Sequence, residues 1–199
     1  MKILNLPNQL TISRIAIVPI LVLLLMFTDE KTLLPGKWTC FIAGLLFAIA
    51  GFTDLIDGYL ARKDNQITSL GKFLDPLADK ILVSSILVML VQIGWIPGWI
   101  AIIIICRDVM VTGLRAIAAD EGVVLAADKY GKLKTVMQLV ALEPLILHYD
   151  FLGLPMHSIG MFFLYVALIL TVYSGCNYFF NFYRDWQKKL SGNNIQDGA

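Results

Sequence analysis

The chain has 199 residues, of which 58% are hydrophobic and only 16% are charged, and its mean hydropathy is +0.74. This composition is typical of an integral membrane protein. The 16 basic and 15 acidic residues give a formal net charge of +1 without a basic tract, so we expect no nucleic acid as a partner.

We predict an all-α integral membrane protein with six transmembrane helices. Several apolar runs reach the length of about 20 residues that crosses a hydrocarbon core of about 30 Å. The connecting segments are short, so we expect one domain over residues 1–199, with a polar tail at about residues 191–199. The expected spans lie at about residues 10–28, 38–60, 73–93, 97–119, 132–150 and 157–183.

The first predicted element is a short segment ahead of the first span. It contains Leu4, Leu6 and Pro7, and we expect it to lie along the membrane interface. Arg14 interrupts the apolar run that follows, and Asp29-Glu30 stand where a cleavable signal peptide needs small residues. We therefore expect the N-terminal stretch to be retained.

Basic residues predict the orientation in the membrane. Lys31 and Lys37 are the only Lys or Arg in the first, third and fifth loops. Because cytoplasmic loops carry the excess of Lys and Arg, both termini should be cytoplasmic. The residues that gather at the termini and in the second and fourth loops are Lys2, Arg62, Lys63, Lys72, Lys129, Lys132, Lys134, Arg184, Lys188 and Lys189.

Four aspartates beside the second and third spans indicate a metal site. Asp54 and Asp57 are three residues apart near the end of the second span, and Asp75 and Asp79 are four apart in the first turns of the third. These spacings put each pair on one helix face, so two antiparallel helices could direct all four carboxylates into one polar cleft. Carboxylates at membrane depth are costly, so we predict a bound cation. Oxygen ligands suit Mg²⁺ or Mn²⁺ better than zinc, and four carboxylates suffice for two ions.

Small residues beside these aspartates favour a ligand-binding site. Gly58 lacks a Cβ, Ala61 lies one turn further on, and Arg62 offers a planar fork suited to phosphate. A phosphorylated ligand could therefore approach the backbone closely. The alternative is that the aspartates are solvated helix-end residues, paired with Arg62, Lys63, Lys72 and Lys80, but four carboxylates in this spacing argue against it.

The string D-x2-D-G-x2-A-R-x8-G-x3-D-x3-D resembles the signature of the CDP-alcohol phosphatidyltransferase family. Its fixed positions are matched by Asp54, Asp57, Gly58, Ala61, Arg62, Gly71, Asp75 and Asp79. The resemblance implies a six-helix membrane enzyme, usually a homodimer, that displaces CMP from a CDP-linked lipid or alcohol with two divalent metal ions.

The resemblance also implies residue roles. The metal ligands would be Asp54, Asp57, Asp75 and Asp79, and Asp79 would also accept a proton. The contacts with the CDP part would be Gly58, Arg62 and Thr68, together with Asn8 and Thr11 at the start of the first span.

Basic residues in the later spans indicate which kind of alcohol displaces CMP, here called the acceptor. Arg107 and Arg115 are eight residues apart on the fourth span, and Lys132 and Lys134 begin the fifth. These cations would draw a phosphorylated alcohol into a site that already holds a pyrophosphate. Positive-inside anchoring is the alternative for the two lysines, and an ion pair with Asp108 is the alternative for Arg107.

Residues Asn5 to Arg14, Arg107 to Arg115 and Gly131 to Thr135 resemble family members that use glycerol 3-phosphate. We therefore expect an enzyme of phospholipid biosynthesis in a bacterial plasma membrane, with its active site facing the cytoplasm. It would transfer the phosphatidyl group of CDP-diacylglycerol to glycerol 3-phosphate and release CMP. The sixth span, Ser158 to Tyr183, indicates only membrane packing, with its Tyr and Phe side chains facing lipid or the interface.

Two alternatives stay open. The same chemistry could use inositol phosphate, serine or phosphatidylglycerol as the acceptor. A divalent-cation or proton-coupled transporter would also carry acidic groups in a membrane, although near the bilayer midplane and in repeated halves.

Overall fold

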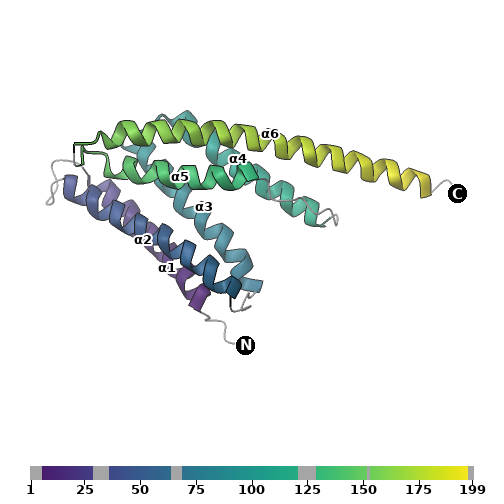
Figure 1. Ribbon diagram of the computed structural model, residues 1–199, viewed down its shortest axis with the longest axis horizontal. Helices are drawn as coiled ribbons and strands as arrows, with labels where there is room; N and C mark the ends of the chain where they lie inside the picture. Colours follow the sequence, from purple (N-terminus) through teal and green to yellow (C-terminus); the bar gives the residue numbers. More distant parts are fainter. Residues whose placement is uncertain (1–5, 29–35, 64–68, 121–128, 152, 197–199) are drawn as a thin grey trace.

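The computed structural model describes residues 6–28, 36–63, 69–120, 129–151 and 153–196, and these residues form six α-helices (Figure 1). The helices are α1 (Leu6–Met26), α2 (Gly36–Lys63), α3 (Ser69–Gln92), α4 (Gly98–Asp120), α5 (Lys129–Leu147) and α6 (Met156–Gln196). The described ranges contain no strand, although Phe151 and Leu154 form an isolated antiparallel bridge in the α5–α6 turn. The predicted all-α fold with six helices is therefore confirmed for these residues.

Two stretches of the described chain are long and apolar enough to cross a membrane. They are Gly36–Thr53 of α2 and Met156–Arg184 of α6, and a shorter apolar stretch, Thr11–Met26, belongs to α1. Other helices carry ionisable residues inside their apolar runs, such as Arg107 and Asp108 in α4. Six membrane-spanning helices and the cytoplasmic position of both termini remain predictions.

The helices pack around an apolar centre. Helix α1 contacts α2 and α3, α5 contacts α6 and α2, and α4 contacts α3 and α6. Because lipid tails are as apolar as leucine, close van der Waals contact, rather than exclusion of water, favours helix association inside a membrane. The fully buried side chains at this centre include Leu21, Leu25, Ile86, Leu90, Leu142, Leu145 and Leu164.

Glycines allow close contact at two helix pairs. A Cβ at Gly160 of α6 would lie 2.6 Å from Leu145 Cγ of α5, and a Cβ at Gly44 of α2 would lie 2.8 Å from Leu147 Cδ2. At Gly160 the backbone N of Leu145 would also lie 2.9 Å from the added Cβ, so a larger residue there would push α5 and α6 apart. Small residues at helix contacts are typical of membrane bundles.

A glycine cap ends α3. Gly94 has a φ of +78°, its N–H donates to Val91 O at 3.0 Å, and the N–H of Trp95 donates to Leu90 O at 2.9 Å. This pair of bonds is the Schellman arrangement, which favours glycine because it needs a left-handed backbone. The short turn that follows leads directly into α4.

Helix α6 is longer than expected. We expected the sixth span to end at about residue 183 and residues 191–199 to form a polar tail, but the helix continues to Gln196. Its 41 residues correspond to about 60 Å, about twice the hydrocarbon thickness, and its C-terminal part projects beyond the other helices (Figure 1). Adding residues to a formed helix costs far less than starting one, which explains why the polar residues remain helical.

The N-terminal turn of α1 lies near the end of α2 and the start of α3 (Figure 1). Leu6 and Pro7 form the first turn of α1 and are continuous with its apolar part, whereas Leu4 lies outside the described residues. Their position at a membrane interface remains a prediction. The fold thus brings the helix ends that carry the acidic motif to one end of the molecule.

Candidate active site

The acidic motif occupies the last turns of α2 and the first turns of α3. Residues 54–76 are described at most by their backbone, so Asp79 is the only one of the four aspartates whose side chain is described. Among the described side chains no three acidic, His or Cys groups gather to hold a metal. The motif and nucleotide residues without a described side chain are Asp54, Asp57, Gly58, Ala61 and Arg62 in α2, Gly71 and Asp75 in α3, and Asn8 in α1, whereas Thr68 lies outside the described residues.

Asp79 forms an ion pair with Arg14, a contact that the spacing of the motif does not predict. Arg14 Nη1 of α1 donates to Asp79 Oδ1 at 2.5 Å, and the Arg14 side chain is only 2% exposed, against 40% for Asp79. An ionisable side chain inside an apolar run needs a partner, and this rule is the sequence signal that could have identified Arg14 as part of the site.

The spacing of residues in α1 explains why Arg14 faces the bundle. Thr11, Arg14, Val18, Leu21 and Leu25 are all buried, and their separations alternate between three and four residues. Such spacing places side chains on one face of a helix. Thr11, which the resemblance assigns to the nucleotide, is therefore on the same buried face as Arg14, one turn earlier.

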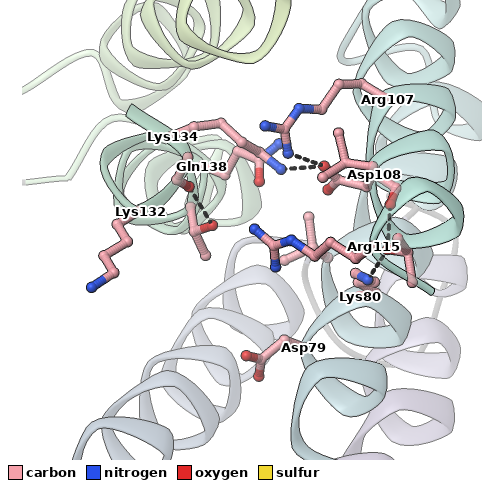
Figure 2. A pocket seen from close by; sticks show the side chains of 13 residues that line it. Asp79, Lys80, Arg107, Asp108, Arg115, Lys132, Lys134 and Gln138 are labelled. Carbon is pink, nitrogen blue, oxygen red and sulfur yellow. Dashed lines mark hydrogen bonds and ion pairs between the residues drawn. The ribbon is translucent and has the colours of Figure 1, made fainter. Parts of the chain in front are cut away.

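A cavity of about 290 Å³ opens beside Asp79 and is lined by residues of α3, α4 and α5 (Figure 2). Five basic and two acidic side chains line it, which leaves a formal charge of +3. A concentration of positive charge in a small cleft attracts anions. The charged lining residues are Asp79, Lys80, Arg107, Asp108, Arg115, Lys132 and Lys134.

Asp108 is the centre of an ion-pair cluster in the wall of this cavity. Its Oδ1 accepts a hydrogen bond from Lys134 Nζ and lies 3.3 Å from Arg107 Nη1 (Figure 2). The Lys134 side chain is 4% exposed, and the Arg107 side chain is 13% exposed. The ion pair that we considered for Arg107 is therefore present, and Arg107 lines the cavity as well.

Helix α6 supports the two arginines from behind. Arg107 Nη2 donates to Ser174 Oγ at 2.5 Å, and a Cβ at Gly175 would lie 3.0 Å from Arg107 Cγ. Arg115 Nε donates to the hydroxyl of Tyr178 at 2.9 Å, and its guanidinium lies 5.0 Å from the centre of that ring. The expectation that the aromatic residues of this span face only lipid or the interface is wrong for Tyr178, which is 4% exposed.

The remaining cations of the cavity lack a carboxylate partner within the described part of the chain. Lys80 Nζ donates to the hydroxyl of Thr112. Lys132 is exposed, and Arg115 bonds only the tyrosine hydroxyl. These charges are therefore available to an anion that enters the cavity.

The structure brings together the four cations that we predicted from α4 and α5. Arg107 and Arg115 of α4 and Lys132 and Lys134 of α5 line one cavity with Asp79 of α3. Positive-inside anchoring explains the exposed Lys132 but not Lys134, which is 3% exposed, because an anchoring lysine extends to water or lipid headgroups.

The chain is similar to known proteins over most of its length. A family model described as CDP-alcohol phosphatidyltransferase matches residues 4–173. A Bacillus subtilis protein named CDP-diacylglycerol--glycerol-3-phosphate 3-phosphatidyltransferase is 42% identical over 197 residues, which cover 95% of this chain and 99% of the relative. A Rickettsia typhi protein of the same name is 38% identical over 176 residues, 88% of this chain and 95% of the relative. A Mycobacterium tuberculosis protein named probable phosphatidylglycerophosphate synthase is 36% identical over 184 residues, 92% of this chain and 84% of the relative.

Proposed function

The chain belongs to the CDP-alcohol phosphatidyltransferase family, and we propose that it transfers the phosphatidyl group of CDP-diacylglycerol to glycerol 3-phosphate. The products are phosphatidylglycerophosphate and CMP. Relatives between 36% and 42% identical, whose names state this activity or its product, align with most of the chain. The protein is thus a membrane-bound transferase of phospholipid biosynthesis.

One observation carries the choice of acceptor. Asp79, the last residue of the family motif, lines the same cavity as five basic side chains. A phosphate monoester carries a charge of about −1.5 to −2 at neutral pH, so a positive cavity beside the reacting group favours a phosphorylated alcohol. Serine and other acceptors without a phosphate would gain much less from it. The cavity volume of about 290 Å³ also lies at the small end of ligand sites, as a three-carbon acceptor requires.

Four aspartates would hold two Mg²⁺ or Mn²⁺ ions: Asp54, Asp57, Asp75 and Asp79. The donor set fits these ions because it consists entirely of carboxylate oxygens at the adjoining ends of two helices. The Asp79 carboxylate is 40% exposed beside Arg14, and a carboxylate offers about four lone-pair sites, so the ion pair is compatible with metal ligation. When bound, such ions neutralise the charge of a pyrophosphate and stabilise a leaving phosphate.

The nucleotide part of the donor would contact α1, α2 and the segment between α2 and α3. Gly58 allows close approach of the backbone, and Arg62 offers a bidentate fork to phosphate. Thr68, Asn8 and Thr11 would complete the contacts with CDP. The Thr11 side chain is fully buried on the face of α1 that carries Arg14, which supports a place for α1 beside the donor.

The acceptor phosphate would lie against Arg115, Lys132, Lys134 and Arg107. Arg115 and Lys132 have no carboxylate partner among the described residues, so their charges suit direct contact with phosphate. Lys134 and Arg107 add positive potential from the buried wall. Binding the phosphate here holds the primary hydroxyl of the acceptor near Asp79, which lines the same cavity.

The transfer itself is a displacement at the lipid-side phosphorus of CDP-diacylglycerol. The primary hydroxyl oxygen of glycerol 3-phosphate forms a bond to that phosphorus, and its proton passes to Asp79. The bond from the phosphorus to the bridging oxygen breaks, and CMP leaves with that oxygen. Asp79 is a weak base beside Arg14, so its contribution depends on alignment with the hydroxyl rather than on basicity.

The membrane arrangement would keep both reactants in place. With six spanning helices and both termini in the cytoplasm, the site faces the cytoplasm of a bacterial cell. The acyl chains of the donor then stay in the leaflet while glycerol 3-phosphate arrives from water. We also propose a homodimer, as the family resemblance implies.

An acceptor panel tests this function. Purified protein in detergent is given CDP-diacylglycerol, Mg²⁺ or Mn²⁺, and one acceptor at a time: glycerol 3-phosphate, inositol phosphate, serine or phosphatidylglycerol. We expect fast CMP release with glycerol 3-phosphate and loss of release in chelator. Faster CMP release with another acceptor would refute glycerol 3-phosphate as the acceptor. No CMP release with any acceptor would favour a transporter.

A further inference from the structure

We propose that Asp108 is a positioning residue of the acceptor site, which holds Lys134 and Arg107 where their charges act on the acceptor phosphate. The inference rests on the proposed function and deepens it. It gives a role to a carboxylate that stands inside a cavity whose purpose is to attract an anion.

A carboxylate in this wall is unfavourable on charge alone. Asp108 lowers the formal charge of the cavity lining from +4 to +3, and like charges repel an entering phosphate. The unfavourable charge of Asp108 must therefore be compensated by another effect. The contacts of its Oδ1 atom with Lys134 and Arg107 identify this effect.

Asp108 keeps the ammonium group of Lys134 charged and fixes its position in the cavity wall. The ammonium group bonds Asp108 Oδ1, and the side chain of Lys134 is only 4% exposed. A buried ammonium without a carboxylate either loses its proton or moves to water. In both cases the cavity would lose one of its cations.

Arg107 is held by the same oxygen. Its Nη1 lies 3.3 Å from Asp108 Oδ1, and its Nη2 bonds Ser174 Oγ. Gly175 leaves no space behind the arginine stem, because a Cβ there would lie 3.0 Å from Arg107 Cγ. Asp108 of α4 therefore joins Lys134 of α5 (Figure 2) and, through Arg107, Ser174 of α6.

Fixing these groups in advance favours catalysis. Charged groups that already occupy their places bind and orient an anion without reorganising when it arrives. The cavity gives up one unit of formal charge and gains two cations with fixed positions. Removal of the Asp108 carboxylate therefore has two opposite effects on acceptor binding. The more positive cavity favours binding, whereas the loss of fixed positions for Lys134 and Arg107 weakens it.

The variant Asp108→Asn separates the two effects. Electrostatics alone predicts tighter acceptor binding, since the cavity charge rises from +3 to +4. Positioning predicts that the KM for glycerol 3-phosphate rises by about tenfold or more, the cost of one charge-assisted hydrogen bond, while the KM for CDP-diacylglycerol changes less than about twofold. Asp108→Glu should recover part of the loss. Asp120→Asn, an exposed carboxylate at the end of the same helix, should match the parent protein.

A double variant guards against a loss of stability that imitates this result. Asp108→Asn with Lys134→Met removes the buried ammonium together with its partner, which is often neutral or stabilising. We expect it to recover the melting temperature but not the KM for glycerol 3-phosphate. Recovery of both would show that Asp108 only stabilises the fold and would overturn the inference.

The inference and the proposed function fail in different ways. If the parent protein releases no CMP with glycerol 3-phosphate, the proposed function fails. If the parent protein is active and Asp108→Asn has an equal or lower KM for glycerol 3-phosphate, the function stands and the positioning role of Asp108 is refuted.

Discussion

The two partners of the Arg14–Asp79 ion pair should differ in their effect on stability. The Arg14 side chain is 2% exposed and the Asp79 side chain is 40% exposed. Asp79→Ala removes the carboxylate from a charge-assisted hydrogen bond with a buried guanidinium, so we expect a loss of about 2–3 kcal/mol in unfolding free energy. Arg14→Met leaves a carboxylate that water reaches and keeps most of the apolar volume, so we expect a loss of about 1 kcal/mol.

Thermal melting in detergent without divalent metal measures this difference. For a chain of this size, 1 kcal/mol corresponds to about 2–4 °C. The melting temperature should fall by about 4–12 °C in Asp79→Ala and by about 2–4 °C in Arg14→Met. Lys132→Met removes an exposed cation of the same cavity and should melt within about 2 °C of the parent protein, as surface substitutions do.

A double variant completes the test. Arg14→Met combined with Asp79→Ala removes both partners of this ion pair, so its loss should be smaller than the sum of the two single losses. Equal losses in the two single variants would refute the reasoning that burial of the remaining partner determines the cost. A greater loss in Arg14→Met would refute it as well.

Two further predictions concern residues of the site. Tyr178→Phe removes the acceptor of the Arg115 hydrogen bond, so the KM for glycerol 3-phosphate should rise about 3- to 10-fold in steady-state CMP release; an unchanged KM would contradict this. Asp79→Asn should bind CDP-diacylglycerol nearly as well as the parent protein while its kcat falls by about 10²–10⁴, and parent-like turnover would remove its role as a base.

The number of helices was predictable because each contains its own apolar run. The extents of those apolar runs also placed most helix ends within a few residues. The continuation of α6 to Gln196 was not predictable in this way, since Ser191, Gly192 and Asn193 have neither apolar periodicity nor strong helix propensity. Their conformation follows from the helix that precedes them.

The site was predictable where its signal is local in sequence. Spacing identified Asp79, and basic residues in apolar helices identified Arg107 and Lys134, which line one cavity with it. The partners Arg14 and Tyr178 were missed because they lie far in sequence from the residues that they contact. Arg14 is 65 residues from Asp79, Tyr178 is 63 residues from Arg115, and both contacts depend on how the helices pack. The apolar surroundings of Arg14 gave the only local indication that such a partner exists.

Product analysis with labelled acceptor tests the central claim most directly. Purified protein is incubated with CDP-diacylglycerol, Mg²⁺ and carbon-labelled glycerol 3-phosphate, and CMP and labelled lipid are measured by mass spectrometry. We predict equal amounts of CMP and labelled phosphatidylglycerophosphate, and neither product in chelator. CMP without labelled lipid, or labelled lipid at the same rate after chelation, would contradict a metal-dependent phosphatidyl transfer to glycerol 3-phosphate.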